Sequence, residues 1–158
     1  MTPQDAYAAL VIHLRRISAL EAASGILSWD QETMMPPKGG PQRAEQRGAL
    51  AAVLHGMRTD PRIPGWIETA SGAEWPADVQ ADLREAARDH ARDVRVPERL
   101  AEALARRTAA AHQDWAAARA ARDFGAFAPA LAEVVALRRE EAQALSDPGQ
   151  DPYDALLN

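Results

Sequence analysis

The stretch WDQETMMPP, residues 29–37, decides how this chain folds, because it ends the first helical pattern with two adjacent prolines. A proline disfavours helical geometry in the residue before it, so the helix must stop by Met35. Residues 38–40, Lys-Gly-Gly, then supply a flexible turn, and Pro41 opens a second helix. Two antiparallel helices joined by a stiff corner are the simplest outcome.

The segment before this corner has the pattern of one long helix from Pro3 to about Trp29. Its apolar side chains recur every three or four residues, which places them on one stripe. They are Tyr7, Leu10, Val11, Leu14, Ile17, Leu20, Ala23, Ile26 and Leu27. Gly25 costs helix stability, so we expect a neighbouring helix to approach closely there. His13 lies beside the stripe, and we expect it at the surface.

Prolines and glycines divide the rest of the chain into further helical segments. The pattern predicts helices over residues 41–58, 61–70, 76–93, 97–122 and 123–146, with Asp123 as the cap of the last. We therefore predict an all-α fold, an irregular antiparallel bundle of about five to six helices. Residues 1–158 form a single helical domain or an N-terminal segment, and residues 151–158 look like the truncated start of a further element.

Composition narrows the classes of function. The formal charge is −5 and the arginines are mixed with carboxylates, so no basic face for nucleic acid is expected. Cysteine is absent, which removes disulfides and thiolate metal sites. No apolar run approaches the length that a bilayer requires, and no leader sequence is evident. We expect a cytoplasmic protein that contacts neither nucleic acid nor membrane.

Candidate catalytic or metal-binding residues do not emerge from the spacing of polar side chains. Helical metal sites place ligands one turn apart, whereas His13, His55, His90 and His112 each stand alone. His90 and Asp93 form one pair at such a spacing, which we interpret as a structural hydrogen bond. We therefore predict that this chain itself has no catalytic residue and no metal ligand.

The residues around this corner also resemble those of a known protein family. The run from Leu27 to Pro36 closely resembles the N-terminal signature of the M32 metallocarboxypeptidases, the carboxypeptidase Taq family. The likeness extends in order through further residues. They are Gly40, Arg43, Ala44, Leu50, Leu54, His55, Leu83, Arg84, Glu85, Val96, Pro97, Leu100, Trp115, Phe127, Ala128, Pro129, Leu131, Val134, Val135 and the run from Pro152 to Leu157.

The resemblance implies a helical, cleft-bearing peptidase fold that uses zinc, or cobalt, to release single residues from peptide C-termini. In that family a HEXXH helix supplies two histidine ligands and the general-base glutamate, and a later glutamate completes the metal site. This sequence has no HEXXH motif. No catalytic or metal-binding residue can therefore be transferred to it, and no cofactor is expected in this chain.

These expectations combine into two hypotheses. The first is that the chain is the N-terminal helical region of an M32-type carboxypeptidase, inactive alone and completed by a C-terminal catalytic part. The second is a stand-alone helical module for protein interaction or oligomerisation, derived from the same family. The expected partners are the catalytic part of the same enzyme and a second copy of the chain in a homodimer.

The signature residues are the candidate site. They are Trp29, Asp30, Gln31, Thr33, Met34, Met35 and Pro36. Two interpretations stay open. If Trp29 packs between the first two helices and Asp30 and Thr33 bond to the loop backbone, the motif is structural. If Gln31 and Met34 project outward, the motif lines the substrate groove. We favour the structural interpretation.

Overall fold

A computed structural model describes residues 1–157 of the chain. Within that range the structure has six α-helices, two short 3-10 turns and no strand. The helices are α1 (Pro3–Thr33), α2 (Gly40–Arg58), α3 (Arg62–Ala70), α4 (Ala77–Asp93), α5 (Glu98–Ala121) and α6 (Phe124–Leu145), and the turns are η1 (Pro37–Gly39) and η2 (Asp154–Leu156). The all-α prediction is confirmed.

The helix ends follow from local chemistry. Thr2 caps α1 in a capping box with Asp5, and Pro3 occupies the first turn. At the other end Met34 and Met35 both donate backbone N–H groups to the carbonyl of Asp30, at 3.0 and 2.8 Å, before the prolines stop the helix. The two prolines thus fix the corner where the sequence predicted it.

The helix α6 begins after a tight reversal of the chain. Arg122 has φ +57°, the left-handed conformation that ends α5. The Asp123 side chain accepts a hydrogen bond from the backbone N–H of Ala126 at 3.1 Å, so it caps α6 as predicted. This short connection makes α5 and α6 antiparallel neighbours.

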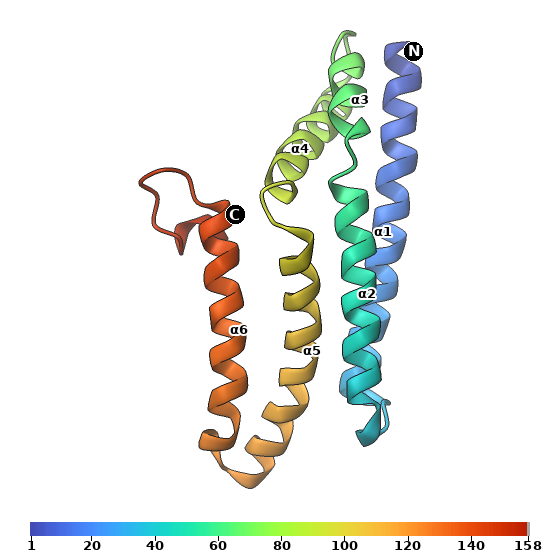
Figure 1. Ribbon diagram of the computed structural model, residues 1–158. Helices are drawn as coiled ribbons and strands as arrows, with labels where there is room; N and C mark the ends of the chain where they lie inside the picture. Colours follow the sequence, from blue (N-terminus) through green and yellow to red (C-terminus); the bar gives the residue numbers. More distant parts are fainter. Residues whose placement is uncertain (158) are drawn as a thin grey trace.

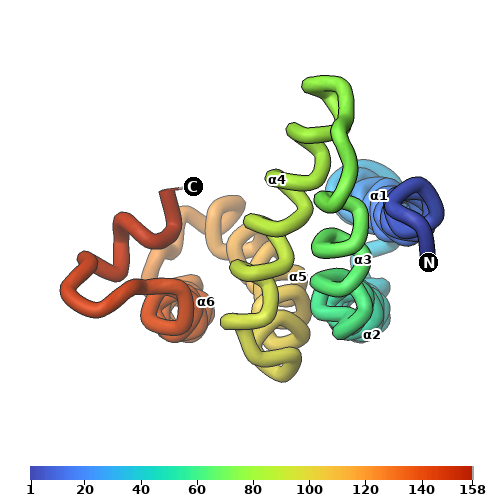
Figure 2. The backbone as a smooth tube through the Cα atoms, turned by 90° about the horizontal axis from the view of Figure 1, so that it is seen from above, coloured from blue at the N-terminus to red at the C-terminus, as the bar shows by residue number. Residues whose placement is uncertain are grey.

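Three helices form one layer. Figure 1 shows α2, α5 and α6 side by side with alternating directions, and the contacts between α2 and α5 and between α5 and α6 hold the layer together. Figure 2 shows α1 on one side of this layer, against α2. The short helix α3 packs on α1, and α4 packs on α3, so these two helices extend from one end of the layer.

The main apolar cluster lies at that end of the molecule. It joins the N-terminal half of α1 to α3 and α4 through Ala6, Leu10, Ile63, Ala70, Leu83 and Ala86. The indole N–H of Trp75 donates to the carbonyl of Ala70 at 2.8 Å, and the Tyr7 hydroxyl donates to Asp82 at 2.7 Å. Polar atoms at the edge of the cluster therefore have partners.

Two sequence expectations about α1 are wrong. No heavy atom lies within 4 Å of a Cβ placed on Gly25, so among the described residues no helix approaches closely there. His13 is buried, with its Nε2 atom 2.7 Å from the carbonyl of Met57 and its ring centroid 5.5 Å from that of Trp66. Both errors have one cause, because the rotation of α1 is set by contacts with distant helices.

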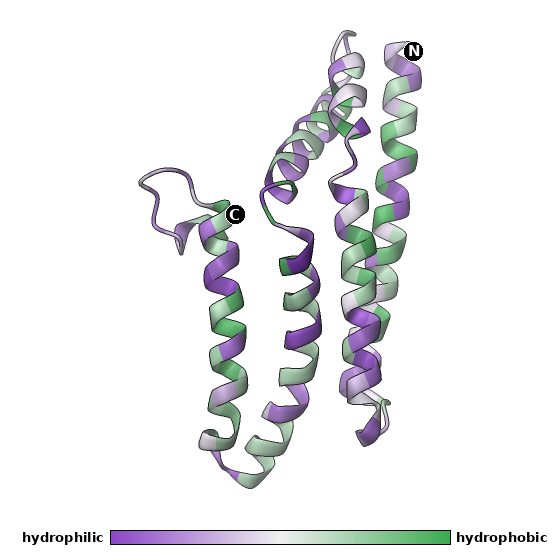
Figure 3. Cartoon of the chain, in the orientation of Figure 1, coloured by the Kyte–Doolittle hydropathy of each residue, from purple (hydrophilic) through white to green (hydrophobic). Residues whose placement is uncertain are grey.

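The helix α6 buries little of its apolar surface. Ala130, Ala142 and Leu145 are its only buried residues within the described chain, whereas Phe124 and Val135 are 68% and 39% exposed. Figure 3 shows hydrophobic residues in green along α6 as well as along α1. Taken singly, no helix in residues 1–157 combines the length and hydropathy needed to cross a membrane.

Candidate functional site

The signature residues form the corner between α1 and α2, where one arginine joins the two helices. The Arg43 guanidinium donates through Nη2 to the carboxylate of Asp30 at 2.5 Å and through Nη1 to the backbone carbonyl of Leu27. Its Nε donates to Gln46 at 3.0 Å. The Arg43 side chain is 10% exposed and that of Asp30 is 35% exposed. The ion pair is therefore partly shielded from water, which strengthens it relative to a surface pair.

Gln31 fastens the same corner to α5. Its Nε2 atom donates to the carbonyl of Ala109 at 2.9 Å, and the residue is 9% exposed. Gly40 adds a second contact, because a Cβ atom there would lie 1.8 Å from the side-chain oxygen of Gln113. A larger residue at position 40 would require the Gln113 side chain to move away. The corner is thus anchored to the middle helix of the layer.

The remaining signature residues point elsewhere. Trp29 is 61% exposed and Met34 is 70% exposed. The Thr33 hydroxyl donates to the carbonyl of Trp29 at 2.7 Å, within its own helix, and Pro36 is exposed. Met35 is half-buried, with its side chain folded over Gly39.

The structural interpretation that we favoured is therefore wrong in three details. Trp29 does not pack between the helices, Asp30 bonds to a side chain rather than to the loop backbone, and Thr33 bonds to a carbonyl of its own helix. The alternative picture also fails for Gln31, which points inward, although Met34 does project outward. The role of Arg43 could not be predicted from the sequence, because its partners Asp30 and Leu27 lie on a separate helix.

The described residues contain no cluster of metal donors. Among residues 1–157, no three His, Asp or Glu side chains come together closely enough to hold a metal ion. The donor groups of this chain therefore do not fit the metal that the family resemblance implies.

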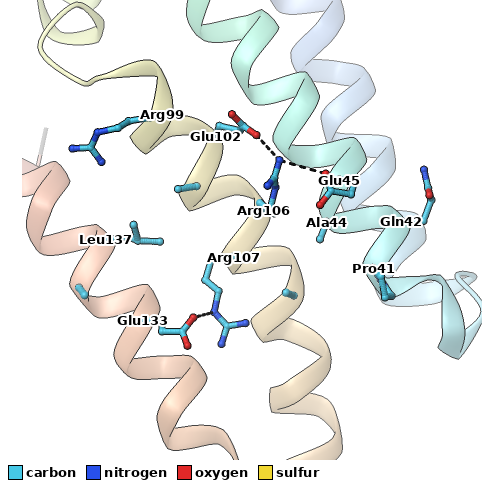
Figure 4. A pocket seen from close by; sticks show the side chains of 13 residues that line it. Pro41, Gln42, Ala44, Glu45, Arg99, Glu102, Arg106, Arg107, Glu133 and Leu137 are labelled. Atoms are coloured by element: carbon cyan, nitrogen blue, oxygen red, sulfur yellow. Dashed lines mark hydrogen bonds and ion pairs between the residues drawn. The ribbon is translucent and has the colours of Figure 1, made fainter.

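A shallow groove of about 890 Å³ crosses the open face of the helix layer. Figure 4 shows it running over α5 between α2 and α6, with α1 behind α2. Small and apolar side chains lie among charged ones along its length. The lining comprises Pro41, Gln42, Ala44, Glu45, Arg99, Glu102, Ala103, Arg106, Arg107, Ala110, Glu133, Ala136 and Leu137.

The charged side chains of the groove pair with one another across helices. Arg107 Nε lies 2.6 Å from a carboxylate oxygen of Glu133 on α6. Arg106 lies 3.3 Å from Glu45 on α2 and pairs with Glu102 on its own helix (Figure 4). The lining has no serine, threonine, cysteine or histidine, and each of its three glutamates pairs with an arginine.

A second polar cluster lies where α1, α2 and α4 converge. Arg58 pairs with Glu21 at 2.5 Å, and both line a cavity of about 400 Å³ that Asp93 also lines. Burial raises the pKa of Asp93, with the nearby Arg58 acting in the opposite direction. His90 and Asp93 both line an adjacent cavity of about 290 Å³, but no hydrogen bond joins them within residues 1–157, and the Nε2 atom of His90 is buried without a partner.

Nearly the whole chain is similar to known proteins. Residues 9–158 match the profile of the family described as Carboxypeptidase Taq (M32) metallopeptidase. Thermostable carboxypeptidase 1 of Thermus thermophilus is 39% identical over 170 residues, covering 100% of this chain and 33% of that protein. Thermostable carboxypeptidase 1 of Pyrococcus furiosus is 30% identical over 145 residues, covering 91% and 29%. The chain thus spans about a third of the length of these curated relatives.

The fold has a close structural counterpart. The crystal structure named BsuCP matches with a TM-score of 0.90, over 97% of this chain and 31% of that chain. Its sequence identity is 23%, so this match shows the fold alone.

Proposed function

Since the chain belongs to the carboxypeptidase Taq (M32) metallopeptidase family, we propose that it is the N-terminal helical region of a metallocarboxypeptidase that releases C-terminal amino acids from peptides. The observation that carries the proposal is the match over residues 9–158 together with its extent, about a third of each curated relative. The chain alone is inactive, and a C-terminal catalytic part supplies the remaining two-thirds.

The catalytic metal, zinc or cobalt, would be held by that catalytic part. The absence of a HEXXH motif from the sequence supports this assignment, as does the separation of the His, Asp and Glu side chains within residues 1–157. The contribution of this chain is then structural. It orders the corner between α1 and α2, and it presents the α2, α5 and α6 layer to the rest of the enzyme.

A chimeric enzyme tests this function. The matched region of T. thermophilus thermostable carboxypeptidase 1 is replaced by residues 1–158, and release of the C-terminal amino acid from a peptide is measured with added zinc or cobalt. We expect the chimera to be active and the isolated chain to be inactive. The intact T. thermophilus enzyme serves as the positive control.

Two results would overturn the proposal. One is a chimera that shows the helical circular dichroism and cooperative melting of a folded protein but no activity while the intact relative is active. The other is metal-dependent carboxypeptidase activity of the isolated chain.

A further inference from the structure

The open face of the helix layer lacks the second layer that helical domains normally have. Helices bury their apolar stripes by packing in at least two layers. The α2, α5 and α6 layer has α1 on one side only, and Figure 2 shows nothing on the other side within residues 1–157. The groove of about 890 Å³ lies on this uncovered side (Figure 4).

The floor of the groove is shaped for close contact with another helix. Ala103 and Ala110 are seven residues apart on α5, which puts them on the same face two turns apart. Ala44 and Ala136 flank them from α2 and α6. Because small side chains let helix axes come within about 8–10 Å, a convex helix can lie along this floor.

The helix α6 lines the groove with Ala136 and Leu137. In residues 1–157 the helix α6 packs mainly against α5 and the turn η2, and Arg95 donates to the carbonyl of Ala144 near its C-terminal end at 3.2 Å. The contacts within this chain therefore leave the groove side of α6 uncovered.

We propose that this groove seats an amphipathic helix of the catalytic part of the enzyme. The inference rests on the proposed function, and it identifies the surface through which the two parts associate. This chain covers 33% and 29% of the two curated relatives, so the rest of each relative is about twice as long as the covered region. That length is ample for such a helix.

A second copy of the chain is the competing occupant. In a twofold dimer the groove of one copy would have to receive a helix of the other copy, and the concentration dependence of labelling described below detects that arrangement.

The charges of the rims are compensated within the chain. Arg107 pairs with Glu133, Arg99 with Glu140, and Arg106 with Glu45 and Glu102. The helix should therefore carry a central stripe of small or apolar residues, flanked by polar ones.

Cysteine labelling measures whether the groove is covered. The chain has no native cysteine, so Ala103→Cys introduces one thiol in the groove floor and Ala91→Cys introduces a control on the exposed face of α4. Maleimide modification of the labelled peptide is followed by mass spectrometry in the isolated chain and in the chimera. We expect labelling at position 103 to slow by about tenfold or more in the chimera, with little change at position 91.

A charged residue introduced into the groove floor tests the same inference through melting temperature and activity. Ala110→Arg should leave the melting temperature of the isolated chain nearly unchanged, because the groove there is open to water. In the chimera the same substitution should lower the melting temperature and the activity together, because it buries an unpaired charge.

The outcomes separate the two proposals. An active chimera in which position 103 labels as fast as in the isolated chain overturns the groove inference and leaves the proposed function intact. A folded but inactive chimera overturns both. If labelling of the isolated chain slows with concentration and light scattering shows a dimer, a second copy fills the groove and the inference is wrong.

Discussion

Arg43 joins α1 and α2 through one guanidinium group, which contacts Asp30 and the backbone carbonyl of Leu27. We predict that Arg43→Ala lowers the free energy of unfolding of the isolated chain by about 2 kcal/mol, because it leaves a partly buried carboxylate without its charged partner. Urea unfolding followed by circular dichroism measures the change. Arg43→Lys should recover only part of the loss, because an ammonium cannot reach both acceptors as the planar guanidinium does.

The matched control is an arginine whose ion pair is exposed. Arg88 pairs with Glu85 at 2.7 Å, and both side chains are more than half exposed. Arg88→Ala should cost less than about 0.5 kcal/mol, as surface pairs generally contribute little. Equal losses for Arg43→Ala and Arg88→Ala would contradict the structural role of the corner.

Asp60 gives the chain a predictable response to acid. Hydrogen bonds from Arg62 lower the pKa of Asp60 to about 2, whereas an aspartate in an unfolded chain titrates near about 4. The ionised form is favoured in the fold, so its stabilisation is complete above about pH 4 and is lost as pH falls from about 4 to 2.

The variant Asp60→Asn tests this response. Its stability deficit relative to the parent chain should be about 1 kcal/mol at pH 5, after screening by solvent, and should shrink toward pH 2. Urea unfolding at several pH values measures the difference. A deficit that stays constant over this range would mean that the carboxylate charge does not contribute.

At the scale of single helices, Gly25 and Gly40 offer opposite environments. A methyl group on Gly25 meets no heavy atom within 4 Å, whereas one on Gly40 would overlap the side chain of Gln113. We predict that Gly25→Ala raises the free energy of unfolding by about 0.5–1 kcal/mol, through the higher helix propensity of alanine. Gly40→Ala should lack this gain, because Gln113 must move away. Chemical unfolding of both variants compares them directly, and a destabilised Gly25→Ala would contradict the open environment.

The helices could be predicted from the sequence because local chemistry sets their ends. The Pro36 and Pro37 pair stops α1, and Asp123 caps α6, and both signals act within one turn. The surroundings of each side chain were harder to predict from the sequence. The expectation for His13 failed because its partners, Met57 and Trp66, lie on segments more than forty residues away.

The same distinction applies to the candidate site. The signature could be located from residues 29–37 alone, but its connections to Arg43 and Ala109 depend on how three helices meet. The groove leaves even less trace in the sequence. Its lining comes from α2, α5 and α6, and alanines such as Ala103 and Ala110 look like ordinary helix formers until the layer is assembled.

For the molecule as a whole, the uneven distribution of apolar contacts should produce uneven stability. The cluster around Leu10 and Leu83 draws on α1, α3 and α4, whereas α6 packs mainly against α5 and keeps Phe124 and Val135 exposed. Segments with few buried apolar contacts open at lower free-energy cost than well-packed ones.

We therefore predict that backbone amides of α6 exchange with deuterium faster than those of α5 and of the N-terminal half of α1 in the isolated chain. Hydrogen exchange read by mass spectrometry on peptides from each helix measures this order. The comparison of α5 with α6 is internally controlled for peptides that follow Pro129, since both helices are long and alanine-rich there and differ in how many neighbours cover them. If α6 were protected as strongly as α5, the prediction would be wrong. The layer would then open as one cooperative unit, and the exposed side of α6 would not lower its local stability.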